Sequence, residues 1–413
     1  MRILTKLGII AGVFSITSCE PTAEVTEQIV MTDTAEVDST VTVALQETQP
    51  ATDTEILAPT TTTAGSAMLM ITDAICEELG AHTYCLSAEW PAPPDTPPDW
   101  GAIIDYSPEI FCAADLATEL CGWVTSALLT AAMEWGNYGP MEYWILGIDK
   151  DAGAQLINTF CQRRDDRKQW PMSQCVEHQS APDGHGFEAY RKIGADAVAS
   201  GQPSGSAGLN GDREWGIHFI TSSIPLGFTD YFEVPGAEEQ KTVFHEHFHA
   251  VQHSYIFTKD YKKRDELLGP VWFNEGGAEY MAQIASRKAR TSGALEDINS
   301  SGRWSFEFRQ NMEHFMYSGT YNISNTCPGT SLKDLSYENN CNNAAYDLGA
   351  WAHAYLAYNF GESVLLEIFL PKVEQLGWEE AFIDSYGMTS DEFYSEFDQF
   401  LKLPPSEQMA ILP

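Results

Sequence analysis

The sequence predicts an α+β fold in which a small β-sheet packs against one central helix and a helical C-terminal half follows. Two runs, 141–146 and 215–231, are apolar and aromatic and have strand character. Residues 238–257 carry apolar side chains at helical spacing. Helical patterns then continue through the C-terminal tail. These three observations place the sheet before the helical half in the chain.

Composition limits the partners of the chain. It has 413 residues, of which 44% are hydrophobic, so a sizeable core is available. Its 59 acidic residues against 23 basic ones give a net charge of −36, and no Lys or Arg lies between Lys6 and Lys150. Such a chain repels nucleic acid and anionic membrane surfaces, so we predict neither as a partner. The charge serves solubility in a salty medium or, alternatively, attracts cationic substrates.

The first 19 residues have the pattern of a targeting segment. Arg2 and Lys6 precede a short apolar run, residues 7–17, which is too short to span a bilayer as a mature helix. The run ends in Ile16-Thr17-Ser18-Cys19, which resembles the lipobox of bacterial lipoproteins. The resemblance implies cleavage before Cys19 and a diacylglycerol anchor on its sulfur. The alternative is a simple secretory signal with an incidental cysteine.

We therefore expect an exported protein that is lipid-anchored to the bacterial cell envelope and touches the membrane only through that lipid. Glu20, the residue after the lipobox, favours the outer membrane or cell surface over retention in the inner membrane. Without Cys19, eight cysteines remain in close sequential couples, and an oxidising compartment makes disulfides their natural use. Eight cysteines allow 105 connectivities, so the pairing stays open. They are Cys76, Cys85, Cys112, Cys121, Cys161, Cys175, Cys327 and Cys341.

The remaining chain divides by composition. Residues 20–66 are acidic and rich in Thr, with no Lys, Arg, Trp, Phe or Cys, which predicts a disordered tether. Residues 67–111 form a small segment with two cysteines and a Pro-rich stretch. Residues 112–413 form the main domain.

Within the main domain we expect helices over 113–135 and 152–161 around the strand 141–146. The mixed-charge run 163–168 is expected to be a solvated surface, and the Gly- and Ser-rich stretch 200–211 a loop. Near the C-terminus, Thr389-Ser390-Asp391-Glu392 is a capping box that starts the last long helix.

The segment His245-Glu246-His247-Phe248-His249 lies within the helix expected over 238–257. His245 and His249 are four residues apart, so both reach one ion from the same helix face. Glu246 then lies beside the ion, placed to act on water rather than to ligate. His247 points about 200° away from His245, and His253 lies about 12 Å along the axis, so neither joins the ion. We expect His253 to be buried or to lie beside the ligands. The alternative for the whole segment is a helix with polar surface histidines.

A second motif lies downstream, Trp272-Phe273-Asn274-Glu275-Gly276-Gly277-Ala278-Glu279-Tyr280, with Pro270 at its helix start. Together with the first motif it resembles the gluzincin metallopeptidases. The resemblance implies a zincin-like fold, a zinc ion held by His245, His249 and Glu275, and Glu279 orienting His245. Gly276 and Gly277 weaken a helix, so we expect them where this helix closely approaches the helix over 238–257.

Tyr346-Asp347-Leu348-Gly349 looks like the Y-x-x-G segment of gluzincin aminopeptidases. The resemblance implies that Tyr346 donates a hydrogen bond to the oxyanion, and the alternative is an ordinary Tyr at a helix start. The spacer from His249 to Glu275 is long, and we expect the excess to be a surface loop over 259–265. No G-x-M-E-N segment, which binds the free amine of aminopeptidase substrates, precedes the first motif.

The sequence thus predicts a zinc-dependent endopeptidase that acts on peptide or protein substrates, with Glu246 and Tyr346 as catalytic residues. Two alternatives remain open. One is a catalytically inactive, zinc-containing surface binding protein. The other is a metallohydrolase of another amide, such as a cell-wall peptide. The oligomeric state is left undetermined.

Overall fold

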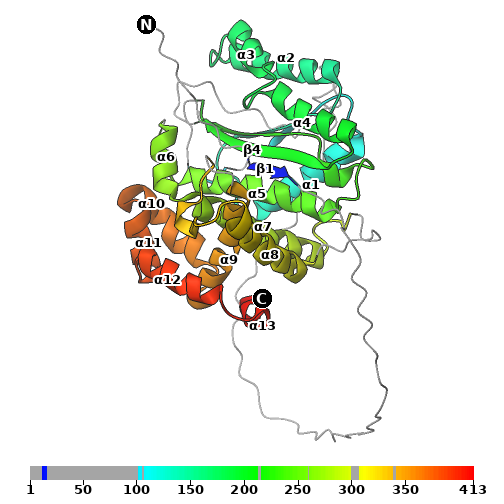
Figure 1. Ribbon diagram of the computed structural model, residues 1–413. Helices are drawn as coiled ribbons and strands as arrows, with labels where there is room; N and C mark the ends of the chain where they lie inside the picture. Colours follow the sequence, from blue (N-terminus) through cyan, green and yellow to red (C-terminus); the bar gives the residue numbers. More distant parts are fainter. Residues whose placement is uncertain are drawn as a thin grey trace, which may run out of the picture. The chain divides into compact units, whose positions relative to one another are not determined.

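The predicted α+β architecture is confirmed: one mixed sheet is followed by a helical half (Figure 1). The computed structural model describes residues 12–15, 101–104, 107–212, 215–258, 260–298, 307–337 and 341–413. The predicted lipobox cysteine, the tether 20–66 and most of the segment 67–111, including Cys76 and Cys85, lie outside the described residues.

The sheet has the strand order β1-β4-β5-β3-β2. β2 (Glu109–Cys112), β3 (Met141–Ile145) and β5 (Ile217–Ser222) are parallel neighbours, whereas β4 (Ser204–Asp212) runs antiparallel to β5. At one edge, β1 (Gly12–Ser15) lies within the expected signal peptide. β3 is buried along its whole length because helices cover both faces of the sheet.

Helices α2 (Lys150–Asp166), α3 (Met172–Gln179) and α4 (Phe187–Ser200) lie on one face of the sheet, and α1 (Thr118–Trp135) lies on the other (Figure 1). α1 begins later than expected, because the chain first completes β2. α2 begins two residues earlier than expected, because the Asp149 side chain caps it by accepting from the N–H groups of residues 151 and 152, and it continues five residues further, to Asp166. The expected boundary between the segment 67–111 and the main domain falls inside β2, so the sheet begins before the expected start of that domain.

The expectation of a loop over 200–211 is wrong for most of that stretch, which forms β4. Its Gly and Ser residues have little intrinsic preference for a strand. β4 nevertheless pairs with β5 from Ala207 to Asp212, with Leu209 opposite Ile220. Pairing with a buried neighbour therefore overrides the local preference of the sequence.

The expectation of a solvated surface at 163–168 holds for Asp165, Asp166 and Lys168, which are exposed, but is wrong for Arg164. The Arg164 side chain is fully buried and forms an ion pair with Glu142 of β3, which is equally buried. Arg163 lies 3.1 Å from the same carboxylate and its guanidinium packs over Phe111. Arg164 thus lies on the side of α2 that covers the sheet, where its guanidinium packs over the rings of Phe160 and Trp215.

The helical half begins with α5 (Gly236–Ser254), which contains the first motif, and continues with α7 (Val271–Ser292), which contains the second. The expected loop between them is wrong for residues 261–265, which start α6 (Tyr261–Leu268), capped by the Asp260 side chain. The capping box at Thr389 and Glu392 is confirmed. The other elements are α8 (Phe308–Asn325), η3 (Leu332–Asp334), α9 (Asn342–Phe360), η4 (Leu365–Phe369), α10 (Leu370–Leu376), α11 (Trp378–Tyr386), α12 (Ser390–Phe400) and α13 (Pro405–Gln408).

α5 lies between two hydrophobic cores. Val243 and Phe244 join the core around the sheet, whereas Phe248 joins the core formed by α7, α9 and the C-terminal helices. Phe244 and Phe248 are four residues apart and lie on the same helix face, and every residue over 243–254 is buried. Any side chains that α5 presents to α7 are therefore held by well-packed surroundings.

The six cysteines among the described residues form three disulfides, each between neighbouring cysteines in the sequence: Cys112–Cys121, Cys161–Cys175 and Cys327–Cys341. Each bond closes a short loop near the end of a helix or strand. Among the helices of the described residues, none combines the length and apolar character needed to cross a membrane.

Candidate metal centre

Three predicted ligands converge where α5 meets α7. His245 Nε2 lies 3.2 Å and His249 Nε2 lies 3.1 Å from the same oxygen, Oε2 of Glu275. The two histidine nitrogens are 3.0 Å apart. Ligand atoms about 2.0–2.2 Å from a tetrahedral ion lie roughly 3.3 Å from one another. The spacing fits an ion with bonds of this length, so this buried group could hold a metal ion.

The helices place these atoms for simple reasons. His245 and His249 are one turn apart on α5 and face α7, where Glu275 lies in the second turn. The expectation that Gly276 serves an approach to α5 is wrong. A Cβ at Gly276 would overlap the backbone of Gly349 on α9, so this glycine permits contact between α7 and α9. Gly277 has His353 of α9 and Gln252 of α5 as its nearest side chains.

The charges of the three groups are strongly coupled. Burial alone would lower the pKa of His245, but hydrogen bonds to the carboxylates of Glu275 and Glu279 raise it to about 10. Burial alone would raise the pKa of Glu275, but His249 and His245 hold it well below its usual range. Two buried carboxylates beside two imidazoles thus favour a positive charge at this point, which a metal cation supplies.

Glu279 contacts His245, as the resemblance implies. Its Oε2 lies 3.1 Å from His245 Nδ1, so it accepts the proton on that nitrogen and leaves Nε2 for an ion. Its other oxygen accepts from Lys241 Nζ at 2.6 Å and from Gln283 Nε2 at 3.1 Å. Burial would raise the pKa of Glu279, but Lys241 and His245 lower it to about 2. The carboxylate is therefore ionised at neutral pH.

Two further partners of the ligands were not predicted from the sequence. Gln252 Oε1 lies 2.7 Å from His249 Nδ1, and the Tyr337 hydroxyl donates to Oε1 of Glu275. Gln252 is three residues after His249, on the same helix face, and this spacing is a signal that could have identified it. Tyr337 lies in the irregular segment between η3 and α9, where no periodic pattern points to it. Each of the three ligands thus has its own hydrogen-bond partner.

Glu246 lies beside the three ligands without joining them. Its carboxylate accepts from the backbone N–H of Leu209 on β4, whereas its Oε2 has no hydrogen-bond partner among the described residues. The residue is only 3% exposed, and burial raises the pKa of its carboxyl group. A buried acceptor without a partner is costly, and a raised pKa suits a group that takes up and releases a proton.

Tyr346 lies in the first turns of α9 and contacts the same group. Its ring stacks on His245, with centroids 5.8 Å apart, and its hydroxyl hydrogen-bonds Glu275. Burial and the carboxylates of Glu275 and Glu246 raise its pKa well above the usual value. The phenol therefore keeps its proton at neutral pH and remains a donor.

The other histidines of α5 do not join the centre. His247 Nε2 donates to the carbonyl of Gly136 at 3.0 Å, and its ring stacks on Trp135. His253 is buried, as expected, with its ring centroid 6.3 Å from that of His249. Burial lowers the pKa of His247 to about 4 and that of His253 well below its usual value. Both side chains are therefore neutral at pH 7.

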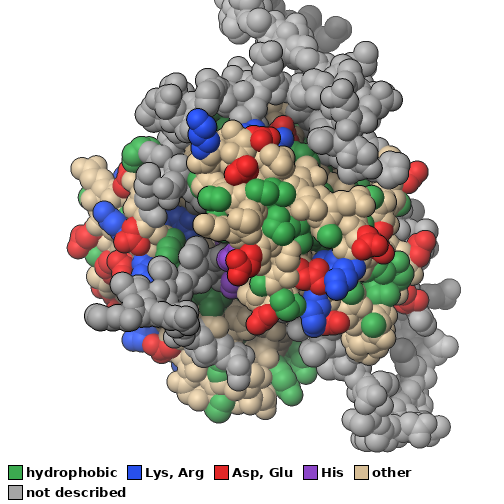
Figure 2. All heavy atoms as spheres, turned by 90° about the horizontal axis from the view of Figure 1, so that it is seen from above, with side chains coloured by type: hydrophobic (Ala, Val, Ile, Leu, Met, Phe, Trp, Pro, Cys, Tyr) green, Lys and Arg blue, Asp and Glu red, His purple; other side chains and the backbone are tan. Residues whose placement is uncertain are grey.

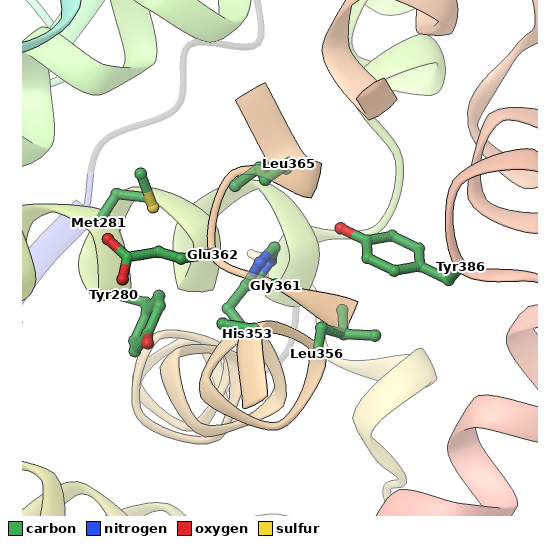
Figure 3. Close-up of a pocket in the computed structure, with 9 residues that line it drawn as sticks. Tyr280, Met281, His353, Leu356, Gly361, Glu362, Leu365 and Tyr386 are labelled. Atoms are coloured by element: carbon green, nitrogen blue, oxygen red, sulfur yellow. The ribbon is translucent and has the colours of Figure 1, made fainter. Parts of the chain in front are cut away.

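Of the three ligands, His249 is the most exposed. The His249 side chain is 9% exposed, against 2% for His245 and 1% for Glu275. The face seen in Figure 2 is hollowed near its middle, where histidine and acidic side chains show together. A separate cavity lies between α7, α9 and α11, lined by residues that include Tyr280, His353 and Tyr386 (Figure 3). Its volume of ≈ 10 Å³ has room for about one water, so it is too small for a peptide.

Comparisons of the chain with family models, with curated proteins and with solved structures found no match in any of the three. The case for a function therefore rests on the geometry of the residues themselves.

Proposed function

We propose that this protein is a zinc-dependent peptidase that hydrolyses internal peptide bonds. The observation that carries the proposal is the position of Glu246. It is a buried carboxylate with one oxygen that has no partner among the described residues, next to three side chains whose ligand atoms converge. A purely structural ion needs no such neighbour, whereas hydrolysis needs a base at this place.

The choice of zinc follows from the donors. Two imidazole nitrogens and one carboxylate oxygen are the set found in catalytic zinc sites that keep one position open. Zinc held here would act as a Lewis acid toward the scissile carbonyl and would make a water molecule more acidic.

The residues of the chain have distinct tasks in this proposal. Glu246 takes the proton of the attacking water and passes it to the leaving amine, a role for which its raised pKa suits it. Tyr346 donates its proton in a hydrogen bond as the carbonyl oxygen gains negative charge. Its own raised pKa keeps that proton in place.

The proposal includes export and lipid attachment at Cys19. Three disulfides support an oxidising compartment. The net charge of −36 favours cationic peptide or protein substrates over anionic ones. Replacing Cys19 by Ser should abolish partitioning into detergent, and unchanged partitioning would contradict the lipid anchor.

One experiment tests the activity. The zinc content of the full chain and its cleavage of a random peptide library are measured for the parent, Glu246→Gln and the exposed control Glu407→Gln. We expect zinc in all three, and hydrolysis reduced by about 10²–10⁴-fold in Glu246→Gln alone. Equal cleavage by Glu246→Gln and the parent would overturn the mechanism. A parent that holds zinc and cleaves nothing would favour the binding-protein alternative.

A further inference from the structure

The side chain of Gln252 links the two helices that carry the candidate ligands. Its Oε1 lies 2.7 Å from His249 Nδ1 on α5, and its Nε2 donates to the backbone carbonyl of Asn274 on α7 at 3.0 Å. Asn274 directly precedes Glu275. Gln252 is 2% exposed, so neither hydrogen bond competes with bulk water.

The direction of the amide group follows from these partners. A backbone carbonyl only accepts, so the NH₂ group of Gln252 must face Asn274. The amide oxygen therefore faces His249, and it too only accepts. Nδ1 of His249 must then carry the proton, which leaves the lone pair on Nε2, the atom that faces Glu275. A carbonyl on α7 thus sets the tautomer of a histidine on α5.

Gly277 of α7 lies next to both Gln252 and His353. A Cβ at this position would lie 3.5 Å from Gln252 Nε2, which is an ordinary contact, and 3.1 Å from the ring of His353, which is a tight one. The glycine therefore makes room mainly for His353 of α9, beside the amide of Gln252. Glu279 likewise accepts the proton on Nδ1 of His245, but through an ionised carboxylate. Gln252 accepts from His249 through a neutral amide and so adds no charge.

We infer that Gln252 is a positioning residue of the metal centre: it holds His249 in the tautomer that binds a cation and fixes Glu275 through its neighbour. This inference rests on the proposed metal site. If Gln252 has this role because of its two contacts, another buried glutamine of α5 without a hydrogen bond to a ligand should not have it. Gln240 is such a residue, 1% exposed and hydrogen-bonded to the carbonyl of Glu296 at 2.7 Å, with no contact to a ligand.

The test uses the full chain as parent, Gln252→Leu, Gln252→Glu and the matched control Gln240→Leu. Zinc and Co²⁺ affinities are measured by chelator competition. We expect Gln252→Leu to bind zinc 10–100-fold more weakly and to show an altered visible spectrum with Co²⁺. Gln240→Leu should retain the affinity and spectrum of the parent. Gln252→Glu keeps an acceptor for Nδ1 but loses the NH₂ donor to Asn274, so it should recover only part of the affinity.

A second readout does not depend on any metal. In ¹⁵N-histidine-labelled protein at pH 8, the parent should show His249 protonated at Nδ1, identified by the loss of its signals in His249→Asn. Gln252→Leu should show the other tautomer or a mixture of both. Parental affinity and tautomer in Gln252→Leu would overturn this inference alone. A parent that binds no divalent metal would instead overturn the proposed function together with this inference.

Discussion

Lys241 Nζ lies 2.6 Å from Oε1 of Glu279, and both side chains are almost fully buried. Lys241 is one turn before His245 on α5, so the cation, the carboxylate and the ligand form a continuous chain of contacts. A buried carboxylate that orients a metal ligand is thus neutralised by a buried cation. Lys241 also pairs with Glu238 at 2.8 Å, and Glu279 also pairs with His245, so removing Lys241 or Glu279 leaves a buried charge with less compensation.

We expect Lys241→Met to reduce the free energy of unfolding by about 3–5 kcal/mol, because it leaves Glu279 buried without its cation. Chemical denaturation at pH 7 measures the change. The matched control is Lys192→Met, whose ion pair with Asp196 is half exposed and should cost about 0.5 kcal/mol or less. Adding Glu279→Gln to Lys241→Met should recover part of the loss. If the two lysine variants were equally stable, the buried pair would have no structural role.

The two tyrosines that contact Glu275 should behave differently when each is replaced by Phe. Tyr346→Phe should lose roughly 10²-fold in kcat, because its donor acts on the oxyanion, and should keep most of its zinc affinity, because Tyr337 still donates to Glu275. Tyr337→Phe should instead lower zinc affinity by about 10–100-fold, because its hydroxyl holds the carboxylate of a ligand. Steady-state kinetics and chelator competition on both variants separate the two roles. A loss of affinity in Tyr346→Phe alone would reverse the assignment.

The buried pair of Arg164 and Glu142 should make stability depend on acid pH. Burial would raise the pKa of Glu142, but Arg164 and Arg163 lower it from 4.5 to about 2. The resulting stabilisation, about 3 kcal/mol, is complete above pH 4.5 and is lost as the pH falls toward 2, where the folded protein also takes up the proton. Denaturant unfolding at a series of pH values measures this loss.

Arg164→Met should therefore destabilise the protein by about 3–5 kcal/mol at pH 7, and its difference from the parent should shrink toward pH 2. The exposed arginine variant Arg287→Met, which loses only a contact with the ring of Phe308, should stay within about 1 kcal/mol of the parent at every pH. A difference between Arg164→Met and the parent that did not change with pH would mean that Glu142 is not the titrating group.

The eight cysteines other than Cys19 should be oxidised in the mature protein. Titration of the denatured, unreduced chain should find almost no free thiol, and two or more free thiols would contradict an oxidising compartment. Replacing Cys161 and Cys175 together by Ser should cost about 3 kcal/mol, as expected for a loop of this size. The midpoint of denaturant unfolding, compared with the parent under oxidising conditions, measures it.

The site could be predicted from the sequence where its geometry is local. His245 and His249 share a helix turn, and Glu275 and Glu279 share another, so spacing alone brings each couple to one face. The side-chain contacts between different helices could not be predicted in this way. Lys241 meets Glu279 and Tyr337 meets Glu275 only because of how the helices pack.

The same physical reason explains the errors in the fold. The strand character of β4 arises from its pairing with β5 rather than from its Gly and Ser residues. Arg164 is buried because Glu142, 22 residues earlier, compensates its charge. In both cases a contact between distant segments overrides a preference that is evident in the local sequence.

The contact between Gly276 and Gly349 fixes the distance between α7 and α9 at the centre. Gly276 follows Glu275 directly, and Gly349 lies one turn after Tyr346, so the two helices touch through their main chains beside both functional side chains. Main-chain atoms have no rotamers to adjust, so the separation of α7 and α9 is set by atomic radii alone. A methyl group at either position would push α7 and α9 apart. The distance from the carboxylate of Glu275 to the phenol of Tyr346 would then increase.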